Sequence, residues 1–75
     1  MQRYRDLSGE SGVVAYDIGD GAITVKFRDG ERYLYTAESA GAENIATMQE
    51  LARAGSGLST FISRHVRDGY ARKLD

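Results

Sequence analysis

The sequence predicts an α+β domain in which a three-stranded antiparallel β-meander is followed by two helices packed on one face (β-β-β-α-α). Two observations carry this prediction: apolar residues recur at every second position up to residue 36, and at helical spacing from residue 39 onward. Glycine-containing turns separate the segments of the first half. Because a sheet with one apolar face needs a covering layer, we expect the two amphipathic helices to supply it.

The chain is long enough for one domain only, because 75 residues can bury a single modest core. We assign residues 1–10 to an N-terminal arm, residues 11–72 to the domain and residues 73–75 to a C-terminal tail. Cysteine is absent, which excludes disulfides and thiolate metal sites. No apolar run approaches membrane-spanning length, and the first residues lack the apolar stretch of a signal peptide. We therefore expect a cytoplasmic protein without membrane contact.

Period-two alternation predicts three strands, at residues 13–18, 22–28 and 31–36. In the first of them, Val14, Tyr16 and Ile18 are expected to share one side. The second has the clearest pattern, with apolar and polar side chains on opposite sides, which is typical of a strand with one face in water. Asp29 and Gly30 form a strong hairpin signal between the second and third strands.

From Ser39 onward the pattern is that of a helix. Ser39 is the expected N-cap, and Ile45 and Met48 begin an apolar stripe at helical spacing. Gly55 is expected to end this helix, because glycine readily adopts the left-handed conformation found after a helix C-terminus.

A second helix is expected to open at Ser56 or Gly57 and to end at Gly69. Its apolar stripe consists of Leu58, Phe61, Ile62, His65 and Val66. We expect His65 to be packed and hydrogen-bonded on this stripe. It is the only histidine in the chain, so it has no histidine or cysteine partner for a zinc site. Residues 70–75 are expected to form no regular element.

The positions of Tyr33 and Tyr35 depend on the loop that precedes them. A two-residue loop pairs Lys26 with Tyr33 and places both tyrosines on the wet face, as an aromatic and basic platform for RNA bases. A three-residue loop with a glycine bulge pairs Val25 with Tyr33 and places both rings in the core. Burial of two aromatic rings would stabilise so small a domain considerably, which favours the core arrangement.

Several motifs, taken in order, carry a resemblance to a known family. They are residues 14–17, 23–27 and 29–30, the triplet Tyr33-Leu34-Tyr35, and residues 61–67 followed by Tyr70. This order resembles the KTSC domain, a module found at the C-terminus of some lysyl-tRNA synthetases and in free-standing small bacterial proteins. The resemblance spans residues 11–72, but the chain has Thr36 and Ala37 where the family usually has Val-Pro. It implies that Tyr33 and Tyr35 are motif residues, and the family's association with synthetases implies RNA binding.

The basic residues are distributed unevenly along a chain whose net charge is −1. From Arg53 onward there are five basic and two acidic residues, a sum of +3; the first 52 residues hold five basic and nine acidic residues, a sum of −4. Arg64 and Arg67 are neighbours on one face of the second helix. The candidate nucleic-acid-binding residues are Arg64, Arg67, Tyr70, Arg72, Lys73, Lys26 and Arg28. The alternative is a solvated surface whose cations pair with nearby carboxylates.

The sequence therefore predicts a small non-enzymatic binding module that contacts RNA through a basic C-terminal helix. No nucleophile-elbow pattern, metal-ligand spacing or cofactor motif is present, so we predict no catalytic residue, no metal and no cofactor. The alternative is a module for protein–protein interaction or self-association. It rests on the two exposed edges that a three-stranded sheet would have.

Overall fold

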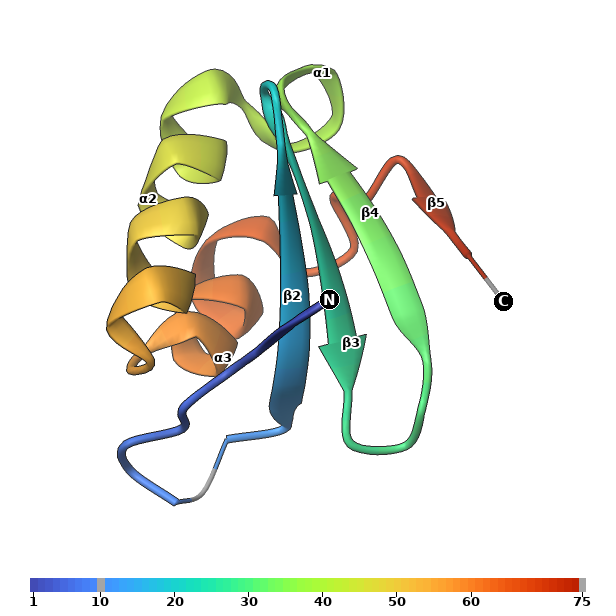
Figure 1. The fold of residues 1–75 in the computed structure, drawn as a ribbon. Coiled ribbons are helices and arrows are strands. Elements are labelled where there is room, and N and C mark those ends of the chain that lie inside the picture. Colours follow the sequence, from blue (N-terminus) through green and yellow to red (C-terminus); the bar gives the residue numbers. More distant parts are fainter. Residues whose placement is uncertain (10, 75) are drawn as a thin grey trace.

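The computed structural model describes residues 1–9 and 11–74 and shows an antiparallel sheet with helices on one side (Figure 1). The five strands lie in chain order: β1 (Gln2–Arg3), β2 (Val13–Gly19), β3 (Ala22–Phe27), β4 (Arg32–Thr36) and β5 (Arg72–Lys73). The helical elements are α1 (Ala37–Ala40), α2 (Ala42–Ala54), α3 (Leu58–Phe61) and the π-helical turn η1 (Ile62–Val66). The predicted α+β meander followed by helices is confirmed, and the sheet gains a short strand at each edge.

The two additional strands correct the prediction for the chain ends. At the C-terminal end, Leu34 pairs with Arg72 in β5, and the Ala71 N–H donates to the Leu34 carbonyl oxygen at 2.6 Å. At the other end, Arg3 of β1 pairs with Ala15. Strands of two residues are too short to produce an alternating pattern, so periodicity does not detect them. Asp75, which the prediction includes in the irregular tail, lies outside the described residues.

The β3–β4 hairpin has the three-residue loop that places the tyrosines on the core side. Val25 pairs with Tyr33, the Phe27 N–H donates to the Glu31 carbonyl oxygen at 2.8 Å, and Gly30 has a φ of +93°. Tyr35 is 2% exposed and Tyr33 is half-buried. The core arrangement is therefore confirmed, and the RNA-stacking platform of two tyrosines on the wet face is wrong.

A bulge in β2 changes which residues of that strand enter the core. The pairing with β3 shifts between Val13 and Ala15, so that Val13 and Tyr16 are both buried although they are three residues apart. An extra residue in one strand reverses the side on which the following residues point. The predicted common side is confirmed for Tyr16 and Ile18, which pair with the buried Val25 and Ile23. It is wrong for Val14, which lies at the bulge, while Val13 takes the buried position before it.

The first helical segment begins earlier than predicted. Thr36, not Ser39, is the N-cap: the Ser39 N–H donates to Thr36 Oγ1 at 3.1 Å, and the Thr36 N–H donates to Ser39 Oγ at 3.0 Å. This reciprocal pair is a capping box with serine in place of the usual glutamate. Gly41, with a φ of +98°, separates α1 from α2. The predicted end at Gly55 is confirmed by its left-handed φ of +76°.

The second helical segment starts after Gly57, as predicted, but ends at Val66 rather than at Gly69. Its last five residues form the wider π-helical turn η1. A π-helical turn rotates the following side chains relative to an α-helix. Consequently His65 is exposed and stacks on Phe61, with 4.6 Å between the ring centroids, instead of being packed in the core.

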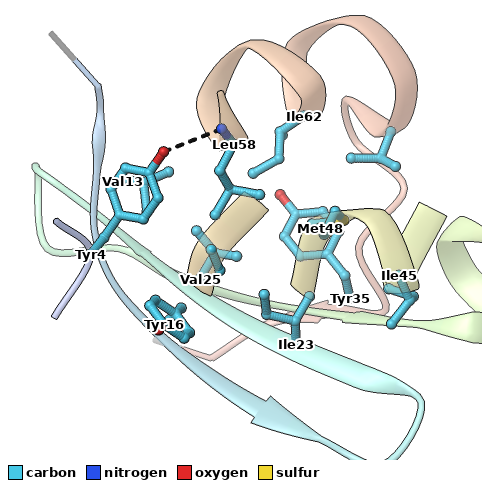
Figure 2. Packing of buried hydrophobic residues seen from close by; sticks show 12 residues of the cluster. Tyr4, Val13, Tyr16, Ile23, Val25, Tyr35, Ile45, Met48, Leu58 and Ile62 are labelled. Atoms are coloured by element: carbon cyan, nitrogen blue, oxygen red, sulfur yellow. Dashed lines mark hydrogen bonds between the residues drawn. The ribbon is translucent and has the colours of Figure 1, made fainter. Parts of the chain in front are cut away.

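One hydrophobic core lies between the sheet and the helices, and Figure 2 shows its central part. Strands β3 and β4 contribute Ile23, Val25 and Tyr35, and α2 contributes Ile45, Met48 and Ala52. The arm also enters the core: Tyr4 is 3% exposed, and its hydroxyl oxygen accepts a hydrogen bond from the Leu58 N–H at 3.3 Å (Figure 2). The arm thus satisfies a free backbone donor at the start of α3.

Tyr35 should make stability sensitive to alkaline pH. Burial raises the pKa of this phenol from 10.0 to about 12. Since the folded state retains the proton more strongly, this stabilisation is fully present below about pH 10 and is lost as the pH rises towards 12. It amounts to at most about 2–3 kcal/mol, at roughly 1.4 kcal/mol per pKa unit. Urea unfolding at about pH 9 and pH 11.5 should show a clearly smaller pH-dependent loss for Tyr35→Phe than for wild type; equal losses would contradict the assignment.

Candidate nucleic-acid interface

Opposite the helices, the sheet has a face on which cations are aligned across the strands. Paired residues of neighbouring strands point to the same side, and successive residues of a strand point to opposite sides. One row of pairs joins Arg3, Ala15, Lys26 and Arg32 across four strands. Lys26 follows Val25, which is fully buried on the helix side, so the row lies on the other face.

A second row on the same face joins Asp17, Thr24, Leu34 and Arg72. We refer to the eight residues of both rows as the open face. Arg3 and Arg72 are exposed, and Lys26 and Arg32 are half-buried. These rows hold four cations and one carboxylate, Asp17. The open face is therefore positively charged on a chain whose net charge is −1.

Lys26 stands directly opposite Arg32 in the β3–β4 ladder. Two neighbouring cations can both donate charge-assisted hydrogen bonds to the oxygens of one phosphate group.

The structure divides the candidate residues predicted from sequence among different parts of the surface. Lys26 and Arg72 lie on the open face. Arg64 is on η1 and Arg67 directly follows it; both are exposed on the helical side. Tyr70 is 37% exposed, and its ring lies 4.7 Å from that of Tyr33. The candidate residues therefore do not form one continuous patch.

Lys73 forms an ion pair with Glu31 beside the outer edge of β4. The hydrogen bond and the charge of Glu31 raise the pKa of the Lys73 ammonium group. Glu31 also accepts a hydrogen bond from the Tyr33 hydroxyl at 3.3 Å, and partial burial together with this carboxylate raises the pKa of Tyr33. Lys73 thus anchors β5, and its charge is already balanced.

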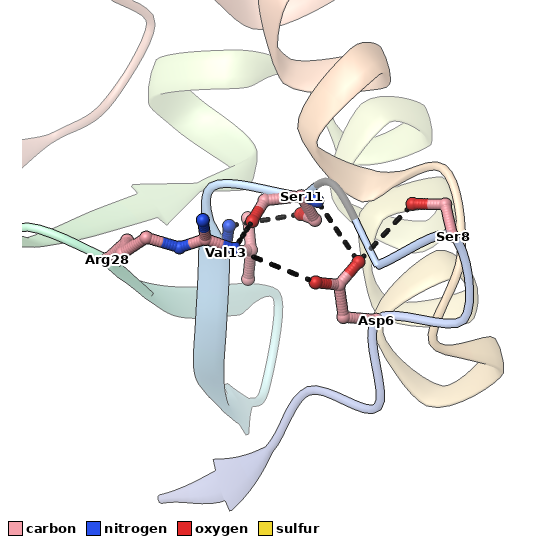
Figure 3. A network of polar contacts seen from close by, with 5 residues as sticks. All are labelled: Asp6, Ser8, Ser11, Val13 and Arg28. Carbon is pink, nitrogen blue, oxygen red and sulfur yellow. Dashed lines mark hydrogen bonds and ion pairs between the residues drawn. The ribbon is translucent and has the colours of Figure 1, made fainter.

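Arg28 holds the loop that leads into β2 (Figure 3). Its guanidinium donates to the Ser11 carbonyl oxygen at 2.8 Å and lies 3.9 Å from an Asp6 carboxylate oxygen. Asp6 accepts hydrogen bonds from the Ser11 N–H at 3.1 Å and from Ser8 Oγ at 3.3 Å. The Arg28 side chain is nevertheless 66% exposed. It therefore has a structural role and remains accessible to a ligand.

Sequence reasoning missed two cations of the open face, Arg3 and Arg32. Arg32 alternates with Tyr33 in β4, so the favoured three-residue loop already implies that it lies opposite Lys26 on the wet face, although it was not among the predicted binding residues. Arg3 belongs to a two-residue strand, for which the sequence contains no usable signal. In residues 1–9 and 11–74, no group of three His, Asp or Glu side chains is arranged to hold a metal ion.

Comparison with known proteins gives no match: no family model fits the chain, and no curated protein and no solved structure resembles it significantly. The resemblance to the KTSC domain stays a prediction. In the described part of the chain, no helix combines the length and the apolar character needed to cross a membrane. Fold and surface together define a small α+β domain whose cationic sheet face is not covered by any helix of the described residues.

Proposed function

We propose that this protein is a non-enzymatic RNA-binding module that contacts the phosphate backbone through the cations of its open face. The observation that carries the proposal is the row in which Lys26 stands opposite Arg32, with Arg3 in the same row and Arg72 in the next. Phosphate oxygens between these side chains would accept charge-assisted hydrogen bonds from them. The resemblance to a synthetase-associated module supports RNA as the polyanion.

The chemistry of the open face favours contact with backbone rather than with bases. Its uncharged members are Ala15, Thr24 and Leu34, and the aromatic rings of β4 point to the other side. Phosphate contacts position a nucleic acid without reading its sequence, and they make the affinity strongly dependent on salt. We therefore expect binding with little sequence preference.

The open face has more support as the interface than the C-terminal helix does. On the helical side, Arg64 and Arg67 are two exposed cations next to Asp68, an arrangement common on solvated surfaces. The open face combines four cations from four strands on one rigid support.

Self-association through a sheet edge, the alternative, has less support. Both edges of the described sheet are two-residue strands, Gln2–Arg3 and Arg72–Lys73. Short and charged edge strands are a common means of preventing edge-to-edge pairing. Each edge offers very few backbone groups to a second chain.

Two double variants with the same loss of charge test the proposed interface. Lys26→Gln/Arg72→Gln should weaken binding of fluorescently labelled pooled tRNA at least about tenfold near 100 mM salt. It should also reduce the slope of log affinity against log salt by about 2, since each phosphate contact contributes roughly one unit. Arg64→Gln/Arg67→Gln should change the affinity less than about threefold.

Fluorescence anisotropy at several salt concentrations provides both quantities, and thermal unfolding checks that the variants are folded. A greater loss of affinity in the Arg64→Gln/Arg67→Gln variant than in the Lys26→Gln/Arg72→Gln variant would show that the helix, not the open face, contacts RNA. Absence of wild-type binding at about 20 mM salt would refute RNA binding altogether, because electrostatic affinity is greatest there.

A further inference from the structure

An open apolar groove lies at the tip of the β3–β4 hairpin, on the opposite side of the sheet from the open face. It is lined by Gly12, Phe27, Arg28, Asp29 and Tyr33 and has a volume of about 430 Å³. This volume lies within the range of small-molecule sites, which is roughly 300–1,000 Å³. The Phe27 and Tyr33 rings point to the helix side, yet both remain half-buried rather than covered.

The two rings form a fixed aromatic surface. Phe27 and Tyr33 meet edge to face, with 5.7 Å between their centroids. Tyr70 packs against Tyr33 at 4.7 Å, and the Tyr33 hydroxyl is held by Glu31. Rings that are already immobilised lose little entropy when a planar ligand stacks on them.

Gly12 keeps one side of Phe27 open. A Cβ atom built on Gly12 would lie 4.0 Å from Phe27 Cδ1, at ordinary contact distance. The backbone of Gly12 is not in the left-handed region, so its conformation does not require glycine. A larger residue would be tolerated by the backbone and would fill the groove.

We propose that this groove receives one unpaired base of the RNA whose backbone lies on the open face; the proposal rests on the function proposed above. Base–aromatic stacking recurs wherever proteins bind unpaired nucleotides. Arg28 and Asp29 both border the groove, so their charges offset each other there. The cations available to the phosphates are Lys26 and Arg32, which lie just before and after the loop on the other face of the same hairpin. A backbone that passes the hairpin tip would meet these two cations on the open face while one base turns into the groove.

The test uses two RNA duplexes that differ by one nucleotide. One is fully paired, and the other carries a single unpaired 2-aminopurine, whose fluorescence falls when it stacks on an aromatic ring. Wild type should bind the bulged duplex about tenfold more tightly than the paired one, and binding should quench the 2-aminopurine, as expected for one stacked base.

Two variants remove the groove in different ways. Gly12→Leu fills it, and Tyr33→Leu keeps apolar bulk but removes an aromatic face. Either change should abolish the preference for the bulged duplex and the quenching of 2-aminopurine. The salt dependence of binding to the paired duplex should stay as in wild type. Thermal unfolding verifies the fold, and the second variant keeps the test valid if the first is destabilised.

The outcomes separate this proposal from the proposed function. Salt-dependent binding of both duplexes with equal affinity and no quenching would overturn the base site alone. Quenching that persists in a folded Gly12→Leu variant would also overturn it. Absence of binding to either duplex would overturn the RNA-binding function, and the base site with it.

Discussion

Replacing Leu58 with alanine is expected to lower the free energy of unfolding by about 3–5 kcal/mol. Leu58 is fully buried at the start of α3, and Figure 2 shows its side chain among those of Val25, Ile62 and Tyr4. Removal of the branched side chain loses burial and leaves a cavity, and the two costs add. The stability of a domain of this size lies near the lower end of about 5–15 kcal/mol, so the variant should be partly unfolded at 25 °C.

Leu7→Ala provides the matched control. Leu7 is 67% exposed, so the same chemical change at this position should alter stability by less than about 0.5 kcal/mol. Urea unfolding followed by circular dichroism measures both variants against wild type. A loss below about 1 kcal/mol for Leu58→Ala would show that α3 does not cover the sheet as described.

Gly55→Ala is expected to lower the free energy of unfolding by about 2–4 kcal/mol, for two reasons that act together. Gly55 has a φ of +76°, a conformation that costs alanine about 1–2 kcal/mol. In addition, an added Cβ would lie 2.8 Å from the Cβ of Arg5 in the arm. Relief of this clash requires the arm to move, which would disturb the hydrogen bond from the Leu7 N–H to the Gly55 carbonyl oxygen.

Gly57→Ala has the first of these costs without the second. Gly57 has a similar φ of +82°, but its Cβ would meet only Leu51 Cδ2, at an ordinary 3.7 Å. This variant should lose about 1–2 kcal/mol, the conformational cost alone. Chemical denaturation of both variants gives the difference, which reports the packing of the arm on Gly55. Equal losses of unfolding free energy in the two variants would mean that the arm can move away from residue 55 without destabilising the protein.

The fold class could be predicted from sequence because alternation and helical periodicity are long-range patterns. The turn residues did not decide the hairpin register, because Asp29 and Gly30 are compatible with both loop lengths; only the expected gain from burying two aromatic rings favoured the observed one. The choice is made by packing: the three-residue loop puts Tyr35 into the core beside Ile23. The position of His65 could not be predicted either, since it depends on a π-helical turn.

The candidate interface could be predicted only in part. Lys26 and Arg72 were identifiable as cations, but their common face depends on the pairing of Arg72 with Leu34 in a two-residue strand. Conversely, the spacing of Arg64 and Arg67 suggested a basic patch on a helix. Cations that are close in sequence can be recognised from the sequence, whereas cations on neighbouring strands can be recognised only from the structure. Register and edge strands, which determine the surface, are established only by the tertiary structure.

The attachment of the arm has a consequence for the order of folding. The partners within the β3–β4 hairpin are close in sequence, whereas the hydrogen bond between Tyr4 and Leu58 joins residues 54 positions apart. Closing a long loop costs more entropy than closing a short one, so contacts between distant residues tend to form after local ones. The arm is synthesised before its partner, because Leu58 leaves the ribosome much later than Tyr4. Strand β1 can pair with β2 as soon as both have formed, but the Tyr4 hydroxyl acquires its donor only when α3 is in place, and that contact completes the core.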